Sequence, residues 1–408
     1  MSGSGAEGVS SGRVDESEEQ ERIAISPARK LAFLGVLMLG LLVALEVLLT
    51  SLVGATVIAY GPKKGGVRTP FIPGSRAELV APEFHVDYRI NRLGYRDYER
   101  ELEKAPGRLR VTVLGDSFTE GWGVEQSEAF PRVAEQRLPG CEVWNLGRHG
   151  GNPLWYAIQI DKVLAEFAPD VVLVQLFDND PWDIKVYRRR FTFAEDLSVT
   201  GERGDRSLPS ALEVWWSRRQ LVRFWKKVRR SLKDRRPMFA EPFYRPGVRP
   251  RRPALSEAEL AARFPEDRVR LEQDKTLGYL DAMDDDWRAV FRHEEAALRQ
   301  VARRCREAGV AFVMLYIPSR RVFQDWSSAD AALASHPHQR LLRRLARELD
   351  CPLVDLATDW RHIGVEPTGL YHRWDGHLNR AGHRRLGRRL AVELVRRVPR
   401  IAAKAEAR

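Results

Sequence analysis

A serine, an aspartate and a histidine stand in this sequence where they could carry out acyl transfer. Ser117 follows an apolar run, Val111–Leu114, that stops at Gly115, and Asp375 and His377 lie near the carboxyl terminus. A serine hydroxyl becomes an effective nucleophile when a base removes its proton, and a carboxylate beside an imidazole fixes its tautomer. These residue types therefore indicate a nucleophile, a base and an orienting acid.

Two further polar positions follow other apolar runs. Gly150 comes shortly after the run 142–147, and Asn179 comes soon after the run 170–177. Acyl transfer produces an oxyanion, which needs hydrogen-bond donors that are already in place. Gly150 and Asn179 are candidates for that role. The alternative is a plain turn glycine at Gly150 and a helix cap at Asn179 with Asp180.

Apolar runs of strand character alternate with helical patterns from residue 109 onward. We expect strands at 109–114, 142–147, 170–177, 310–317 and 352–356, and helices near 129–138, 153–167, 287–308 and 339–349, with a last helix ending near 398. The alternation predicts an α/β fold, a doubly wound (flavodoxin-like) parallel five-stranded sheet between helices. The carboxyl ends of parallel strands share one edge, so the five candidate residues can meet there. The competing interpretation is that Asp116, Ser117 and Thr119 only cap the next helix.

The blocks at these strand ends resemble those of the SGNH (GDSL-type) hydrolase superfamily, over residues 108–398. The matching positions are Gly115-Asp116-Ser117 for the first block, Asn145 and Gly150 (N-x₄-G) for the second, Asn179-Asp180 for the third, and Asp375 with His377 for the last. The resemblance implies that Ser117 attacks, His377 takes its proton and Asp375 orients the imidazole. It also implies an oxyanion hole made of the backbone N–H groups of Ser117 and Gly150 and the side chain of Asn179, with no metal and no cofactor.

Two positions depart from the superfamily pattern. Phe177 stands where the third block, G-x-N-D, has its glycine, and Asp375 is two residues before His377 where many members have D-x-x-H. With the shorter spacing, another carboxylate or a backbone carbonyl is an alternative partner for His377. The D-x-H spacing, followed by Asn379, is similar to membrane-associated members that handle O-acetyl groups on cell-surface polysaccharides. The segment Ile90–Glu99 resembles the I-N-x-x-G-[FY]-R segment upstream of GDSFT-type members.

The resemblance implies a serine esterase that acts on O-acyl esters, chiefly O-acetyl esters of an envelope glycan, through an acyl-enzyme on Ser117. Hydrolysis and transfer differ only in whether water or a sugar hydroxyl resolves that intermediate. One alternative is therefore an O-acetyltransferase to a polysaccharide. Two others are a lipid esterase and a non-catalytic scaffold of a polysaccharide-modifying complex.

The amino-terminal part predicts a membrane anchor. Residues 1–28 are rich in Gly, Ser and acidic groups and predict a disordered cytoplasmic tail. Residues 31–60 are apolar almost without a break. The length of this stretch exceeds the ~20 residues that a helix needs to cross a bilayer. We expect one transmembrane helix within 29–60, with a cleavable signal peptide as the alternative. Basic residues flank both ends of this stretch, so the expected single-pass topology, with the catalytic domain outside the cytoplasm, rests on the short acidic tail.

The rest of the chain divides into a linker and lead-in segment at 61–107, the hydrolase domain at 108–398 with a basic helical insertion at about 183–287, and a tail at 399–408. The net charge of +11 comes largely from arginines in the middle and carboxyl-terminal thirds. The stretch 215–236 predicts an amphipathic basic helix that binds a membrane surface or packs on the core. Nucleic-acid binding is not expected, because no recognition fold accompanies the charge. The three cysteines do not make a disulfide framework.

Overall fold

The computed structural model describes residues 26–53, 71–203, 277–280, 282–320, 336–358 and 367–406, with short pieces between 63 and 68 and between 219 and 259. The chain divides into two units, Met1–Leu48 and Leu49–Arg408. Helix α1 (Pro27–Val53) contains the stretch Pro27–Leu48, within which an 18-residue window has a mean hydropathy of 2.6. By length and composition this stretch is a candidate for a membrane span or a signal sequence. Residues 54–60 of the predicted span lie outside the described residues.

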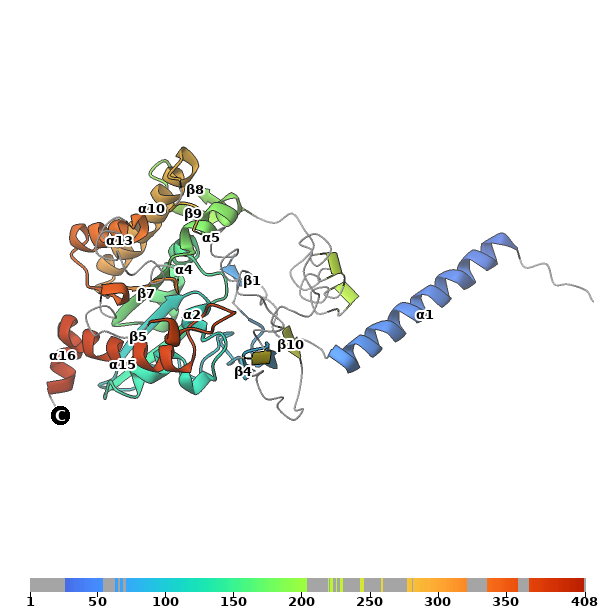
Figure 1. Ribbon diagram of the computed structural model, residues 1–408, viewed down its shortest axis with the longest axis horizontal. Coiled ribbons are helices and arrows are strands. Elements are labelled where there is room, and N and C mark those ends of the chain that lie inside the picture. The colour runs from blue at the N-terminus through green and yellow to red at the C-terminus, as the bar shows by residue number, and fades with distance from the viewer. Residues whose placement is uncertain are drawn as a thin grey trace, which may run out of the picture. The chain divides into compact units, whose positions relative to one another are not determined.

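The second unit is built on a sheet of five parallel strands (Figure 1). The strands are β5 (Leu109–Gly115), β6 (Cys141–Gly147), β7 (Val171–Phe177), β11 (Ala311–Ile317) and β12 (Leu353–Asp355), in the order β12-β11-β7-β5-β6. The predicted doubly wound fold is thereby confirmed. The chain leaves β5 toward β6 on one side and then returns to β7 on the other. The carboxyl end of β5 is therefore the switch point of the sheet, where open α/β folds bind their ligands.

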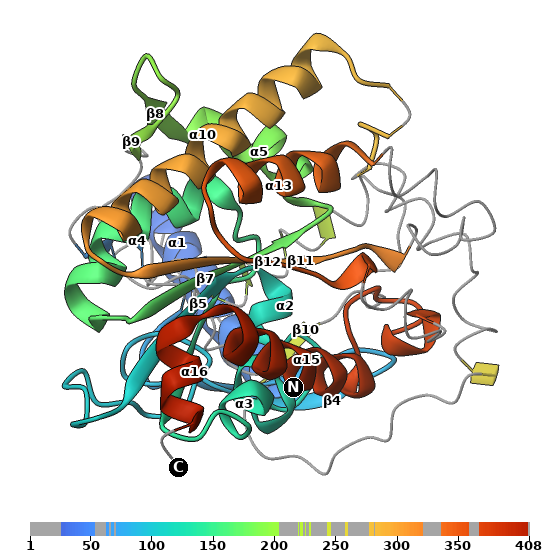
Figure 2. The same ribbon diagram turned by 90° about the vertical axis from the view of Figure 1, so that its left-hand side faces the viewer.

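Helices cover both faces of this sheet (Figure 2). One face carries α4 (Pro153–Phe167), α10 (Asp285–Glu307) and α13 (Pro337–Glu348), and the other carries α3 (Phe130–Glu135), α15 (Arg380–Arg397) and α16 (Pro399–Glu406). Each face has its own apolar cluster. In α10 the buried residues recur every three or four positions, which is the pattern of a helix that packs one face on a core.

Helix α16 lies where the sequence predicted a tail. Pro399 begins the helix, and Ile401 is buried in the same apolar cluster as Leu394 of α15. Proline is well suited to the first position of a helix, and the alanines that follow favour helix formation. With one buried apolar side chain in two helical turns, the apolar pattern is too short to predict this helix from the sequence.

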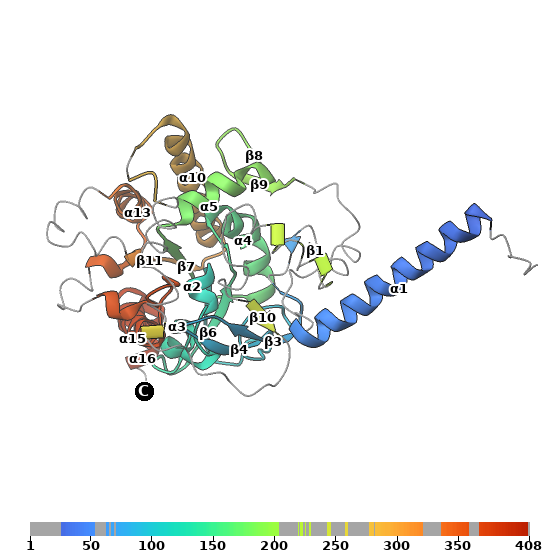
Figure 3. The same cartoon turned by 45° about the vertical axis from the view of Figure 1, so that its right-hand side comes forward.

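The lead-in segment, residues 71–107, forms a small layer of its own. Strands β3 (Arg76–Val80) and β4 (His85–Arg89) make an antiparallel hairpin, and β10 (Phe243–Arg245) pairs with the other side of β3 (Figure 3). An apolar cluster of this layer includes Leu79, Tyr88 and also Trp122, which follows the end of β5 by seven residues. Through Trp122 the lead-in layer is joined to the loop that carries Ser117.

The I-N-x-x-G-Y-R segment has a structural role in that junction. Asn91 Oδ1 accepts hydrogen bonds from the backbone N–H groups of Leu93 and Tyr95, both at 3.0 Å, and Gly94 takes a φ of +83° in the resulting turn. The buried Arg96 then donates to the carbonyl of Val124 at 2.6 Å and to that of Gly121. The motif therefore fixes the chain just after Ser117 from outside the sheet.

Part of the predicted insertion at 183–287 is described. It contains α5 (Asp180–Tyr187), the 3₁₀ turn Arg188–Arg190, and a hairpin of β8 (Phe191–Phe193) and β9 (Val199–Glu202). Apart from a few single positions, the basic stretch 215–236 lies outside the described residues. Near the start of the unit, β1 (Lys63–Lys64) pairs with β2 (Val67–Arg68).

Candidate active site

The turn that follows β5 carries Ser117. We call residues 115–121 the nucleophile turn; it includes the short helix α2 (Ser117–Glu120). Asp116 is the cap of α2, because its carboxylate accepts the backbone N–H of Phe118 at 2.8 Å. A side chain at Gly115 would place its Cβ 2.0 Å from Thr119 Oγ1, so only glycine fits there. The capping interpretation thus holds for Asp116, while the hydroxyl of Ser117 has a different partner.

That partner is His377. The Ser117 Oγ lies 2.7 Å from His377 Nε2, and His377 Nδ1 lies 2.5 Å from Asp375 Oδ1. Ser117 is buried, and the side chains of His377 and Asp375 are 20% and 14% exposed. Three residues from the two ends of the domain therefore form one hydrogen-bonded chain, open to solvent on the side of the imidazole.

The charges of this chain suit a base held by an acid. Burial alone would raise the pKa of Asp375, but the facing imidazole of His377 lowers it to about 2. Burial alone would lower the pKa of His377, but the carboxylate of Asp375 raises it above the usual value. The imidazole can therefore accept a proton from Ser117, and the resulting cation is stabilised by a carboxylate that stays ionised.

The two-residue spacing of Asp375 and His377 is accommodated by a tight loop. We call residues 371–379 the acid–base loop. Gly376 takes a φ of +85° between the two side chains, a conformation that favours glycine. The His377 backbone N–H also approaches Asp375 Oδ1 at 3.4 Å. The structure thus brings Asp375 itself to the imidazole, rather than another carboxylate or a carbonyl.

Trp122 is a site residue that the sequence did not reveal. Its indole Nε1–H donates to Asp375 Oδ2 at 3.2 Å, and its ring centroid lies 5.8 Å from that of His377 and 4.6 Å from that of His149. The available signal was its place directly after Gly121, one residue beyond the nucleophile turn. Apolar periodicity gave it no special meaning, because aromatic residues next to glycines are common in turns.

The loop that carries Gly150 lies over the end of β5. The Arg148 backbone N–H donates to the carbonyl of Gly115 at 3.0 Å, and a Cβ on Gly151 would lie 2.7 Å from the same oxygen. Gly150 has a φ of +67°. The buried Glu120 carboxylate accepts the His149 backbone N–H at 2.6 Å, which ties this loop to the nucleophile turn.

Glu120 is itself held from the lead-in layer. The Tyr88 hydroxyl donates to its other carboxylate oxygen. Burial raises the pKa of Glu120 to about 7, although this hydrogen bond lowers it. Glu120 was not singled out by the sequence, since an acid in the first turn of a helix is common.

Asn179 follows β7 and caps α5 by position. Its amide Nδ2 donates to Asp183 Oδ2 at 3.3 Å, and among the described residues Oδ1 has no hydrogen-bond partner. The structure therefore places Asn179 at the carboxyl edge of the sheet with its amide directed to Asp183 rather than hydrogen bonded to Ser117. Phe177, in the position of the superfamily glycine, packs its ring 4.2 Å from that of Phe118.

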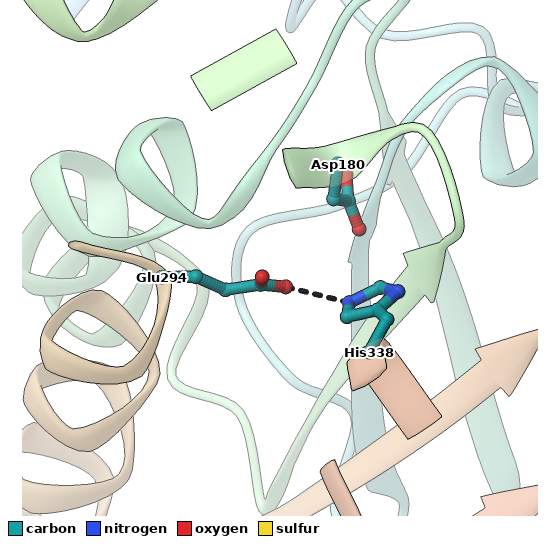
Figure 4. Close-up of side chains that lie close together, drawn as sticks. All are labelled: Asp180, Glu294 and His338. Carbon is teal, nitrogen blue, oxygen red and sulfur yellow. Dashed lines mark hydrogen bonds and ion pairs between the residues drawn. The ribbon is translucent and has the colours of Figure 1, made fainter. Parts of the chain in front are cut away.

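One group in the described part of the chain has the residue types of a metal centre. The ligand atoms of Asp180, Glu294 and His338 lie within 4.8 Å of one another (Figure 4). However, His338 Nε2 lies 2.7 Å from Glu294 Oε1, and Nδ1 lies 3.4 Å from Asp178 Oδ1. Burial alone would lower the pKa of His338, but these two carboxylates raise it to about 10. Both ring nitrogens of His338 thus face carboxylates, and the contacts with Glu294 and Asp178 join α10 and α13 to the residue that follows β7.

Comparisons with known proteins give one family match. The model of the GDSL-like lipase/acylhydrolase family matches residues 113–385. Among curated proteins no sequence matches the chain.

Three solved structures illustrate the likeness in fold. TesA is 14% identical, with 70% of this chain and 97% of that chain covered and a TM-score of 0.35. A catalytic mutant of the acetylxylan esterase Axe2 from Geobacillus stearothermophilus is 14% identical, with 72% and 96% covered and a TM-score of 0.36. The two-domain esterase CEX, active on acetylated mannans, is 11% identical, with 71% and 49% covered and a TM-score of 0.34.

Proposed function

The chain belongs to the GDSL-like lipase/acylhydrolase family and is a serine ester hydrolase, and from this premise we propose that Ser117, His377 and Asp375 are its catalytic residues. The observation that carries the proposal is the 2.7 Å contact between Ser117 Oγ and His377 Nε2, with Asp375 at the other ring nitrogen. Nucleophile, base and orienting acid have the order and contacts that acyl transfer requires.

In the proposed reaction His377 Nε2 takes the proton of the Ser117 hydroxyl as Oγ bonds to the ester carbonyl carbon. The carbonyl oxygen becomes an oxyanion. When the C–O bond to the alcohol breaks, His377 returns the proton to the leaving oxygen and an acyl-enzyme remains on Ser117. A water molecule, deprotonated by the same imidazole, then releases the acid.

We propose that the oxyanion is held by the backbone N–H groups of Ser117 and Gly150 and by the side-chain amide of Asn179. The loop of Gly150 is tied to the end of β5, which supports its part in this hole. The amide of Asn179 would have to turn from Asp183 toward the substrate. Losing one such donor typically costs roughly 10²–10³ in rate.

For the substrate we propose O-acetyl esters carried by a glycan of the cell envelope. The support is the D-x-H arrangement of the acid–base loop, which resembles that of members handling O-acetyl groups on polysaccharides, together with the apolar helix α1. In this proposal α1 is a single-pass anchor and the catalytic domain lies outside the cytoplasm. Transfer of the acetyl group to a second sugar hydroxyl uses the same acyl-enzyme and is the principal alternative outcome.

The test uses the full-length protein in detergent. The wild type should react with a fluorophosphonate probe and hydrolyse p-nitrophenyl acetate, and Ser117→Ala should lose both. Ser127→Ala is the matched control, because Ser127 is exposed and lies outside the triad. Acetylated oligosaccharides, with free acetate and acetylated acceptor measured separately, distinguish hydrolysis from transfer. Folded wild-type protein that resists the probe and leaves all esters intact would overturn the catalytic proposal in favour of a scaffold.

A further inference from the structure

We propose that Glu83, in the lead-in layer, is a positioning residue of the reaction: its carboxylate holds the acid–base loop in the conformation that presents Asp375 to His377. The inference rests on the proposed catalytic roles of Ser117, Asp375 and His377. It assigns to the lead-in layer a part in catalysis that the catalytic blocks themselves do not include.

The contacts of Glu83 are unusual in number. Glu83 stands in the connection between β3 and β4, and its carboxylate accepts three consecutive backbone N–H groups of the acid–base loop. The distances are 2.6 Å from Arg373 N to Oε1, 2.9 Å from Trp374 N to Oε2, and 2.7 Å from Asp375 N to Oε2. Successive N–H groups that converge on one anion form a backbone nest, and here the anion is a side chain about 290 positions away in sequence.

The acid–base loop has backbone hydrogen bonds of its own at other positions. They are the bridge between Tyr371 and Leu378, the bond from His372 N to His377 O at 2.7 Å, that from Gly376 N to His372 O at 3.1 Å, and that from Asn379 N to Leu370 O at 2.9 Å. None of these involves the N–H groups that Glu83 binds. Partly buried backbone donors need acceptors, and Glu83 supplies them for three residues in a row.

Glu83 acts on the catalytic acid through the backbone of the same residue. Its Oε2 binds the Asp375 N–H, while the Asp375 carboxylate contacts His377 Nδ1 through Oδ1 and the Trp122 indole through Oδ2. Asp375 is thereby fixed at both its backbone and its side chain. Because the D-x-H spacing leaves only Gly376 between acid and base, this external anchor replaces the restraint that a longer local turn would give.

The surroundings of Glu83 act on its charge in two directions. Burial, with the neighbouring charge of Asp375, raises the pKa of Glu83 above its usual value, although the three N–H groups lower it in part. Next to Glu83 in sequence, the Phe84 ring packs 4.9 Å from the ring of His372. The hairpin therefore contacts the acid–base loop through both a polar and an apolar side chain, and the two contacts together fix the position of the loop.

The experiment compares full-length Glu83→Ala, Glu83→Gln and the control Glu103→Ala, whose carboxylate is exposed in the same lead-in segment. A displacement of about 1 Å in a catalytic group can cost on the order of 10² in rate. We expect Glu83→Ala to lower kcat for p-nitrophenyl acetate by about 10- to 100-fold with KM within about twofold. Glu83→Gln, which keeps one acceptor oxygen, should fall between it and the wild type. Glu103→Ala should match the wild type.

A second readout separates positioning from a loss of stability. If Asp375 turns away, it no longer stabilises the protonated imidazole, and the pKa of His377 falls. The acid limb of the kcat profile should then move to lower pH in Glu83→Ala, while partial unfolding would reduce activity without moving the limb. Thermal unfolding reports the folded fraction of each variant.

The outcomes are distinct from those for the catalytic proposal. Folded Glu83→Ala with kcat within twofold of the wild type and an unmoved acid limb overturns the inference even when Ser117→Ala is inactive. If Glu83→Ala does not fold, the test rests on Glu83→Gln. A folded Glu83→Gln variant whose kcat and acid limb match those of the wild type also overturns the inference. Full activity of Ser117→Ala would instead refute the catalytic roles themselves.

Discussion

The nucleophile turn and the acid–base loop carry the two parts of the proposed catalytic triad, but they are held in different ways. The nucleophile turn continues directly from a central strand, its cap is its own Asp116, and its Gly115 packs against Thr119 of the same turn. The acid–base loop directly follows the 3₁₀ turn Pro367–Leu370, and remote side chains, Glu83 and Trp122, bind its backbone and its acid. The nucleophile turn is therefore built mainly on its strand and on steric fit, with added contacts from Arg96 and Tyr88, whereas the acid–base loop depends chiefly on remote side chains.

This difference decides where each half is vulnerable. Changes inside the nucleophile turn should act through steric fit with neighbouring backbone, which few other residues can relieve. Changes around the acid–base loop should act through hydrogen bonds, so that each lost contact removes part of the restraint. The predictions below probe that contrast, from the largest expected effect to the smallest.

The orienting acid should show the largest effect. Asp375→Asn keeps the size of the side chain but removes the charge that fixes the tautomer of His377 and stabilises its protonated form. Loss of such a carboxylate costs on the order of 10⁴ in kcat, and we expect a loss of that order at pH 7 with near-normal thermal stability. Steady-state kinetics with p-nitrophenyl acetate would measure it. A loss below tenfold would mean that another group orients His377.

The second-largest effect should come from a steric change next to the nucleophile turn. A Cβ on Gly147 at the end of β6 would lie 2.2 Å from the Glu120 backbone nitrogen, so Gly147→Ala must push α2 out of place. Overpacking of this kind costs about 1–3 kcal/mol of unfolding free energy, and the shift of Ser117 should lower kcat about 100-fold.

The matched control lies beside the other half. Gly369, in the 3₁₀ turn Pro367–Leu370, has nothing within 4 Å of its added Cβ, and Gly369→Ala should leave kcat and thermal stability unchanged. Equal losses for the two glycine variants would contradict the view that close backbone packing holds the nucleophile turn in place.

The same contrast explains what the sequence could predict. The five strands, the serine at the end of β5 and the pairing with His377 follow from apolar runs and from the shared edge of a parallel sheet, and the structure has them in those places. Glu83 gave no signal, because its function depends on N–H groups that lie far away in sequence. The orientation of the Asn179 amide also escaped prediction, since a side-chain torsion next to Asp183 leaves no trace in residue spacing.

The pH dependence should report the charge pairing of the remote half. Although burial alone lowers the pKa of His377, Asp375 raises it, so the imidazole loses its proton only above the usual value of about 6.5. Because the neutral imidazole is the base, kcat/KM for p-nitrophenyl acetate should rise with pH and level off above that value, and fall about tenfold per pH unit below it. A limb centred well below pH 6.5 in the wild type would show that Asp375 does not stabilise the protonated form.

The smallest effect should come from Trp122→Phe, which keeps an aromatic ring against His377 but removes the N–H that donates to Asp375 Oδ2. A hydrogen bond to a charged group contributes about 1.5–3 kcal/mol, yet Asp375 is ionised both before and during proton transfer, so most of that contribution does not change the barrier. We expect kcat to fall about three- to tenfold, with KM nearly unchanged. Combining Trp122→Phe with Glu83→Gln should lower kcat by more than the product of the single effects, because in each single variant the other contact still restrains the acid–base loop. Simple multiplication of the two effects would show instead that the indole and the carboxylate restrain Asp375 independently.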